Sequence, residues 1–164
     1  MAKHTVVRTD LMAGTDVNAA LCSIRFYSSS NPADVDNGVI VELKELDKGE
    51  REIMKAEAAT AESKLVNCAI VATPEVMYGE RLQNLDDFYN EAGKPARAYL
   101  LKEGDIFSVT ENGFEGSAPS VGGNVGIGTG GKMNSTGSEI GKCIAIEKTG
   151  RYTYYTVRVT GSLA

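Results

Sequence analysis

The sequence is poor in the residues on which most active sites depend. It has one histidine, His4, no tryptophan, and three cysteines that lie far apart. A single histidine near the start leaves a serine or cysteine nucleophile without an oriented base, and scattered cysteines give no zinc-binding pattern. Histidine-based hydrolysis and a histidine-rich zinc site are therefore disfavoured. We predict no catalytic residue, no metal ligand and no cofactor.

Long hydrophobic runs and basic blocks are also missing. The longest uninterrupted apolar run is Cys68–Ala72, far short of the ~20 residues that a membrane-spanning helix needs. The chain has 22 acidic and 17 basic residues, and no window combines clustered lysine and arginine with aromatics, as nucleic-acid binding requires. We therefore expect neither a membrane nor a nucleic acid as a direct partner. An odd number of cysteines without a close pair fits a reducing compartment.

Two stretches look like ligand-binding motifs but do not satisfy them. Gly126–Lys132 has most of a phosphate-binding loop, yet Met133 stands where that loop needs a magnesium-binding hydroxyl. Asp34–Gly38 resembles part of a calcium loop, but its glycine comes one position early and the closing acidic ligand is missing. We interpret the first stretch as an inter-strand loop and the second as a polar turn.

The remaining composition is that of a globular protein with short strands. The chain has 164 residues, of which 42% are hydrophobic and 24% charged, values that suit one domain with its own core. Alternating or apolar runs predict strands, and the segment 51–58 is compatible with helix or strand. The predicted strands are 39–44, 64–73, 96–101, 106–110, 144–147 and 152–160. We expect hairpins for 96–110 and 144–160.

The fold class predicted is mainly β with one short helix, as a small β-barrel or sandwich of β-tulip-like form with an extended N-terminal arm. Residues 1–34 are expected to form the arm and a loop, and residues 35–164 a single β-rich domain. The helix is placed near 80–92, where Leu82, Leu85 and Tyr89 recur at helical spacing. The glycine-rich stretch 113–141 is predicted to be a surface loop system.

The C-terminal strand carries a run of aromatic and basic residues. Tyrosine and arginine are enriched where proteins meet one another, but a tyrosine strand can equally belong to the core with its polar tips exposed. Both interpretations stay open for this group, which comprises Arg151, Tyr152, Tyr154, Tyr155 and Arg158.

Two segments resemble structural proteins of tailed-phage virions. They are PEVMYGERLQNLDDFYNEAGKPARAYLLKEGDIFSVT, Pro74–Thr110, and GKCIAIEKTGRYTYYTVRV, Gly141–Val159. The chain is most similar to capsid decoration, or head-stabilising, proteins. That resemblance implies a non-enzymatic protein that is assembled in the host cytoplasm and binds the outer surface of the phage head. It also implies two kinds of partner: the major capsid protein, and further copies of the chain, with which it forms a trimer.

Within this resemblance, the N-terminal arm is the expected contact with the capsid. An extended segment can add a strand to an exposed sheet edge of a neighbour. The capsid-binding residues predicted on this basis are Thr5, Val6, Val7, Arg8, Thr9 and Leu11. One alternative is a tail-tube or head-to-tail connector subunit, and another, from a different class, is a small ligand-binding or hydrolytic β-barrel.

Overall fold

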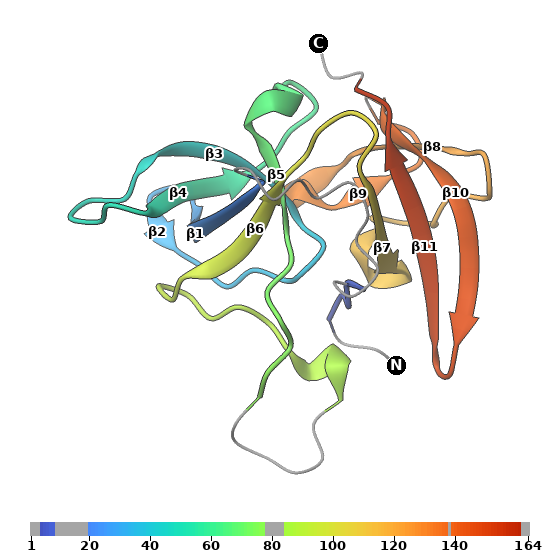
Figure 1. Ribbon diagram of the computed structural model, residues 1–164, viewed down its shortest axis with the longest axis horizontal. Coiled ribbons are helices and arrows are strands. Elements are labelled where there is room, and N and C mark those ends of the chain that lie inside the picture. Colours follow the sequence, from blue (N-terminus) through green and yellow to red (C-terminus); the bar gives the residue numbers. More distant parts are fainter. Residues whose placement is uncertain (1–3, 9–19, 78–83, 138, 162–164) are drawn as a thin grey trace.

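A computed structural model describes residues 4–8, 20–77, 84–137 and 139–161. It contains two β-sheets that lie side by side (Figure 1), which confirms the mainly β fold class. The strands are β1 (Leu21–Ser28), β2 (Asn31–Pro32), β3 (Ile40–Leu46), β4 (Ile53–Ala58), β5 (Cys68–Val71), β6 (Ala96–Leu100), β7 (Ile106–Thr110), β8 (Asn124–Ile127), β9 (Met133–Asn134), β10 (Glu139–Thr149) and β11 (Tyr152–Val159).

The first sheet closes into a barrel. Its strand order is β2-β1-β4-β3-β5-β6, and β1 also pairs with β6, so β1, β4, β3, β5 and β6 form a ring. The β1–β4 pair is parallel, whereas the other pairs of the ring are antiparallel. Closure removes the open edges that a flat sheet would expose. Segment 51–58, which the sequence left open, is strand β4 over most of its length.

The barrel and the second sheet share a wall formed by β3 and β5. Ile70 of β5 packs against the second sheet, and its neighbour Val71 packs inside the barrel. Successive strand residues point to opposite faces, so a strand covered on both sides needs an apolar residue at every position. This explains why β5 is a continuous apolar run that is buried throughout.

The second sheet has the order β7-β11-β10-β8-β9. The predicted final hairpin is confirmed, because β10 and β11 pair antiparallel along almost their whole length. Phe107, Val125 and Val157 are almost fully buried and contribute to the core between this sheet and the barrel wall. Cys68 and Cys143 are buried, and burial raises the pKa of the Cys68 thiol to about 11.

The helix predicted near 80–92 is wrong for the part that the structure describes. Residues 84–92 contain only the 3-10 turn η3 (Leu85–Asp87), and positions 80–83 lie outside the described residues. Asn90 forms a two-way backbone bridge with Val35, which holds the chain in an extended path where a helix would continue. Throughout the described residues the helical elements are three-residue 3-10 turns, none long enough to cross a membrane.

The glycine-rich stretch 113–141 is also not a surface loop system. It contains β8, β9 and the start of β10, and Val125, Met133 and Ile140 in it are fully buried. Its glycines allow close approach of backbones: a Cβ at Gly131 would lie 2.2 Å from the carbonyl oxygen of Ile40. Several glycines of this stretch, including Gly113, Gly128 and Gly131, are therefore sites of tight packing and not of the flexibility that the sequence suggested.

Two further expectations differ from the structure. The turn near residue 104 is present, but β6 joins the barrel and β7 joins the second sheet, so segments 96–101 and 106–110 do not form a hairpin. The expected arm, residues 1–34, contains β1, which is a wall of the barrel. The sequence of β1, LCSIRFYS, shows little alternation of apolar and polar residues, and only Ile24 in it is fully buried. For this reason the sequence did not predict β1.

Candidate partner-binding surface

The most prominent surface feature is a long connection between two neighbouring barrel strands. Residues 72–95 leave the barrel after β5 and return to it at β6, and the described part projects from the body at the bottom of Figure 1. We call this segment the excursion. Connections in compact domains are usually only a few residues long, and long ones are commonly functional. From Pro74 onward, the excursion belongs to the first segment for which we noted a resemblance to phage virion proteins.

Side-chain amides hold both ends of the excursion to the barrel. Asn37 is completely buried, donates from Nδ2 to the Thr73 carbonyl at 2.8 Å, and accepts from the Thr73 amide at 3.0 Å. The Asn90 side chain donates to the Val35 carbonyl at 3.0 Å and to Asn37 Oδ1 at 3.1 Å. Since buried polar groups with full sets of partners resist displacement, the base of the excursion is fixed in position.

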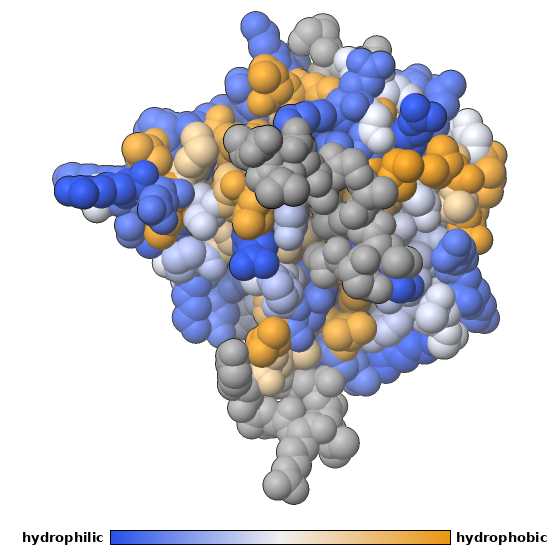
Figure 2. All heavy atoms as spheres, viewed as in Figure 1, coloured by the Kyte–Doolittle hydropathy of each residue, from blue (hydrophilic) through white to orange (hydrophobic). Residues whose placement is uncertain are grey.

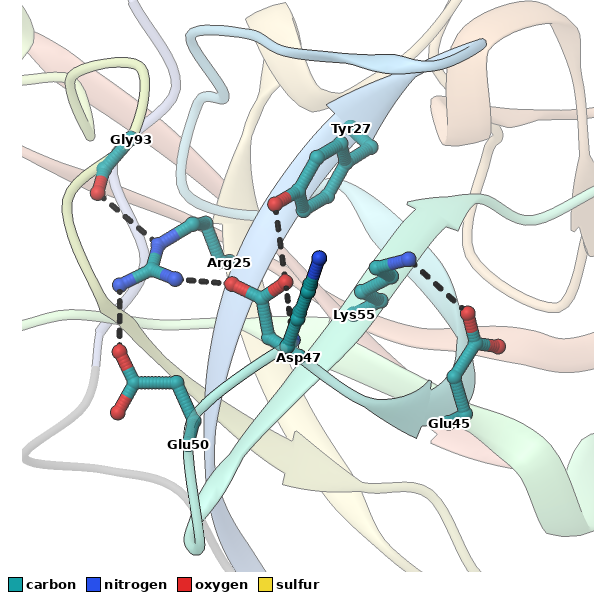
Figure 3. Close-up of polar contacts among 8 residues, drawn as sticks. Arg25, Tyr27, Glu45, Asp47, Glu50, Lys55 and Gly93 are labelled. Carbon is teal, nitrogen blue, oxygen red and sulfur yellow. Dashed lines mark hydrogen bonds and ion pairs between the residues drawn. The ribbon is translucent and has the colours of Figure 1, made fainter.

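A polar network on the barrel holds the returning end (Figure 3). Arg25 of β1 donates from Nε to the Gly93 carbonyl at 3.0 Å, and its guanidinium also binds Asp47 and Glu50 of the β3–β4 turn. Tyr27 donates to the other oxygen of Asp47 at 3.1 Å. Burial opposes ionisation of Asp47, but the donors around it dominate and lower the pKa of its carboxyl group.

The described part of the excursion presents apolar side chains to solvent. Val76, Leu85 and Tyr89 are 54%, 43% and 39% exposed, and hydrophobic surface is visible at the base of the projection in Figure 2. A groove of about 570 Å³ lies between the two limbs of the excursion, with Met77 and Phe88 in its lining. Apolar residues gathered on a fixed projection are typical of a site that contacts another protein.

The two segments that carry the resemblance pair through β7 and β11, and they also meet at a buried carboxylate. Asp86, in the excursion, accepts a hydrogen bond at 2.7 Å from the Tyr152 hydroxyl and pairs with Arg151, and both partners lie at the turn between β10 and β11. Burial, followed by the hydrogen bond to Asp86 and the negative charge of that residue, raises the pKa of Tyr152. No local pattern in the sequence indicates this contact.

The predicted tyrosine and arginine group does not form one surface. Tyr154 is buried beneath Arg8, whose guanidinium carbon lies 5.3 Å from the ring centroid, whereas Tyr155 packs against the core and meets Phe114 edge to face. Arg158 is exposed. An interface role for the group stays a prediction, and the structure assigns the packing of Tyr154 and Tyr155 to the fold.

Of the four predicted capsid-binding residues that the structure describes, three are buried. Thr5, Val6 and Val7 are 1–2% exposed, and Val7 forms an antiparallel bridge with Val109 of β7. The expectation of a free arm is therefore wrong for these three residues, because they are packed against the body at the edge of the second sheet. Arg8 is half-buried, and Thr9 and Leu11 lie outside the described residues.

His4 joins the N-terminal segment to the excursion. Its Nδ1 atom lies 2.8 Å from a carboxylate oxygen of Asp36, its ring stacks on Tyr89 at a centroid distance of 5.3 Å, and its backbone amide donates to the Asp86 carbonyl. These contacts form one side of a second pocket, of about 300 Å³. Within the described residues no group of three or more histidine, cysteine or acidic side chains is arranged to hold a metal ion.

Comparison with known proteins gives a similarity in structure but no match to a family model or a curated protein. No protein-family model matches the sequence, and no curated protein matches it. Among solved structures the chain is similar to the crystal structure of the head fiber gp8.5 N base of bacteriophage phi29. The match has a TM-score of 0.47 and 14% sequence identity, and it covers 94% of this chain and 98% of that chain. A TM-score at this level does not establish a shared fold.

Proposed function

We propose that this chain is a non-enzymatic structural subunit of a tailed-phage particle. It binds the outer surface of the head through the excursion and stabilises the lattice of the major capsid protein. The observation that carries the proposal is the set of exposed apolar residues Val76, Leu85 and Tyr89 on a connection whose two ends are held to the barrel. From Pro74 onward, the same connection lies in the first of the two segments that resemble virion proteins.

The described ends of the excursion are suited to this role because little order has to be created in them on binding. Ordering a loose loop costs part of the interaction free energy, and a segment held by buried amides avoids most of that cost. A head presents the same site many times at fixed spacing, so an oligomer can bind several sites at once and gain affinity without new contacts. Self-association, as a trimer, is part of the proposal.

The apolar contacts can be tested with two substitutions on the excursion. Replacing Val76 and Leu85 by serine removes half-exposed side chains that, once covered by a partner, contribute about 1 kcal/mol each. The double variant should therefore bind purified undecorated heads roughly thirtyfold more weakly in a co-sedimentation assay. Its unfolding free energy should change little, because surface substitutions away from packed contacts have small effects.

A matched control comes from another exposed valine. Val66 is 75% exposed and lies on the 3-10 turn η2 (Leu65–Asn67), outside the excursion. Val66→Ser should bind heads like the unaltered chain. Failure of the unaltered chain to bind heads, or equal binding by the double variant, would show that the excursion is not the contact.

Copy number distinguishes the proposed role from a tail-tube or connector role. A subunit that covers the head should approach the copy number of the capsid protein, whereas one connector ring holds about a dozen copies by closed-ring symmetry. Quantitative mass spectrometry of purified particles measures this ratio directly.

A further inference from the structure

The N-terminal segment 4–8 lies in a groove formed by parts of the chain that are distant in sequence. Its backbone continues the second sheet: the Arg8 amide donates to the Ser108 carbonyl and the Thr110 amide donates to the Val6 carbonyl, both at 3.1 Å. Main-chain pairing of this kind is how extended peptides bind an exposed sheet edge. In Figure 1 the segment, in dark blue, lies at the lower end of β7.

The groove is shaped for the side chains of this segment. Cβ atoms placed on Gly38 and Gly113 would lie 2.7 and 3.2 Å from the Thr5 methyl group, so both glycines leave room that Thr5 occupies. Val7 enters the hydrophobic core, and Val6 is 2% exposed. The occupant that fits is an extended peptide with a small residue followed by two aliphatic residues, which describes this chain's own residues 5–7.

The described contacts of the segment do not depend on its covalent connection to β1. Its partners in these contacts come from the excursion, the 36–38 turn, β7 and the turn after it, and β11. Residues 9–19 connect Arg8 to Ala20, and a connection of that length can span roughly 40 Å when extended. This reach is comparable with the diameter of a domain of this size.

We propose that the groove is a strand-acceptor site that takes residues 4–8 of a second copy of this chain. A segment from a neighbour makes the same hydrogen bonds and fills the same volume, so exchange between copies loses no contact. The local concentration of neighbouring chains then decides how often exchange occurs. The inference rests on the self-association included in the proposed function, and it names the element that joins the copies.

Cysteine pairs can detect exchange. Val7 and Val109 face each other as a non-hydrogen-bonded antiparallel pair, since the flanking bonds run from Arg8 to Ser108 and from Thr110 to Val6. Such pairs have Cα atoms about 4.5 Å apart, within the range that a disulfide spans. The native thiols should interfere little, because burial raises the pKa of all three.

The experiment uses two full-length variants, Val7→Cys and Val109→Cys, that carry tags of different size. They are co-expressed, purified without heads and oxidised mildly. We expect a disulfide-linked heterodimer on a non-reducing gel that is absent when either variant is expressed alone. Because heads are omitted, the result is independent of whether the protein binds a capsid.

The control places both cysteines in one chain. The double variant should form an intramolecular disulfide at high dilution, which shows that the pair is correctly placed and that the variant folds. A second pair, Arg8→Cys with Ser108→Cys, repeats the test if a cysteine in the core prevents folding of the first. Closure of the disulfide within the double variant, together with no heterodimer from either mixed pair, would overturn the proposal.

Discussion

An alanine substitution at Gly131 tests whether the glycine-rich stretch 113–141 is part of the packed core. A Cβ at this position would lie 2.2 Å from the Ile40 carbonyl oxygen, which already accepts a hydrogen bond from the Ala59 amide. Gly130, the preceding residue, also has a positive φ, but a Cβ added there would meet no atom within 4 Å beyond its chain neighbours. The pair therefore separates the effect of backbone conformation from the effect of close approach.

We expect both alanine substitutions to lose stability, by different amounts. An alanine in the left-handed region costs about 1 kcal/mol, and this applies to both positions. At Gly131 the methyl group must also displace the Ile40 carbonyl, a distortion comparable with overpacking a core, which costs about 2 kcal/mol more. Gly130→Ala should therefore lose about 1 kcal/mol and Gly131→Ala about 3 kcal/mol.

Urea unfolding of the two variants and the unaltered chain measures the difference, provided that the denaturant slope stays constant. Amide exchange of Ala59 should become faster in Gly131→Ala and should be unchanged in Gly130→Ala. Equal losses in the two variants would mean that the loop moves away from the barrel without cost, and the assignment of this stretch to the core would then be refuted.

Two further predictions concern buried polar groups. Thr5 Oγ1 has no hydrogen-bond partner among the described residues, so Thr5→Val should stabilise the fold by about 1 kcal/mol in urea unfolding. Thr5→Ser keeps the hydroxyl and loses the methyl group, so it should destabilise the fold. A loss of stability in the valine variant would contradict this reasoning. The pKa of Asp47 is lowered in the folded state from an ordinary value of 3.8, so its contribution is complete above that pH and declines as the pH falls through the lower folded value. Asp47→Asn should weaken this acid dependence between pH 5 and pH 2, and an unchanged pH profile would contradict the role of the Arg25 and Tyr27 contacts.

The sequence was most informative where one face of a strand, or both faces, are apolar. The alternation of Val39, Val41 and Leu43 and the continuous apolar run around Ile70 predicted β3 and β5 correctly, because burial there follows directly from the period of the strand. The turn at Gly150 between two β-rich runs predicted the β10–β11 hairpin for the same local reason. Local patterns therefore indicated these strands, but not which sheet each strand joins.

Several errors arose from contacts between residues far apart in the chain. The spacing of Leu85 and Tyr89 suits a helix, but the bridge from Asn90 to Val35 opposes it. Val6 and Val7 were too few to suggest a core on their own, and the groove that buries them contains β7. The Asp86 contact with the β10–β11 turn was missed because it connects two segments that carry no mutual signal in a single sequence.

The pairing of the N-terminal segment with β7 has a consequence for the newly made protein. Val6 and Thr110, which are hydrogen-bonded, are 104 positions apart, and at about 5–20 residues per second translation separates them by roughly 5–20 seconds. During this interval Val6 and Val7 have left the ribosome without a partner strand. Ribosomes that follow one another on a messenger RNA hold several chains at this stage close together. The time in which residues 4–8 of one copy can reach β7 of another copy is therefore set by the rate of protein synthesis. No finished molecule has to open for the two to meet.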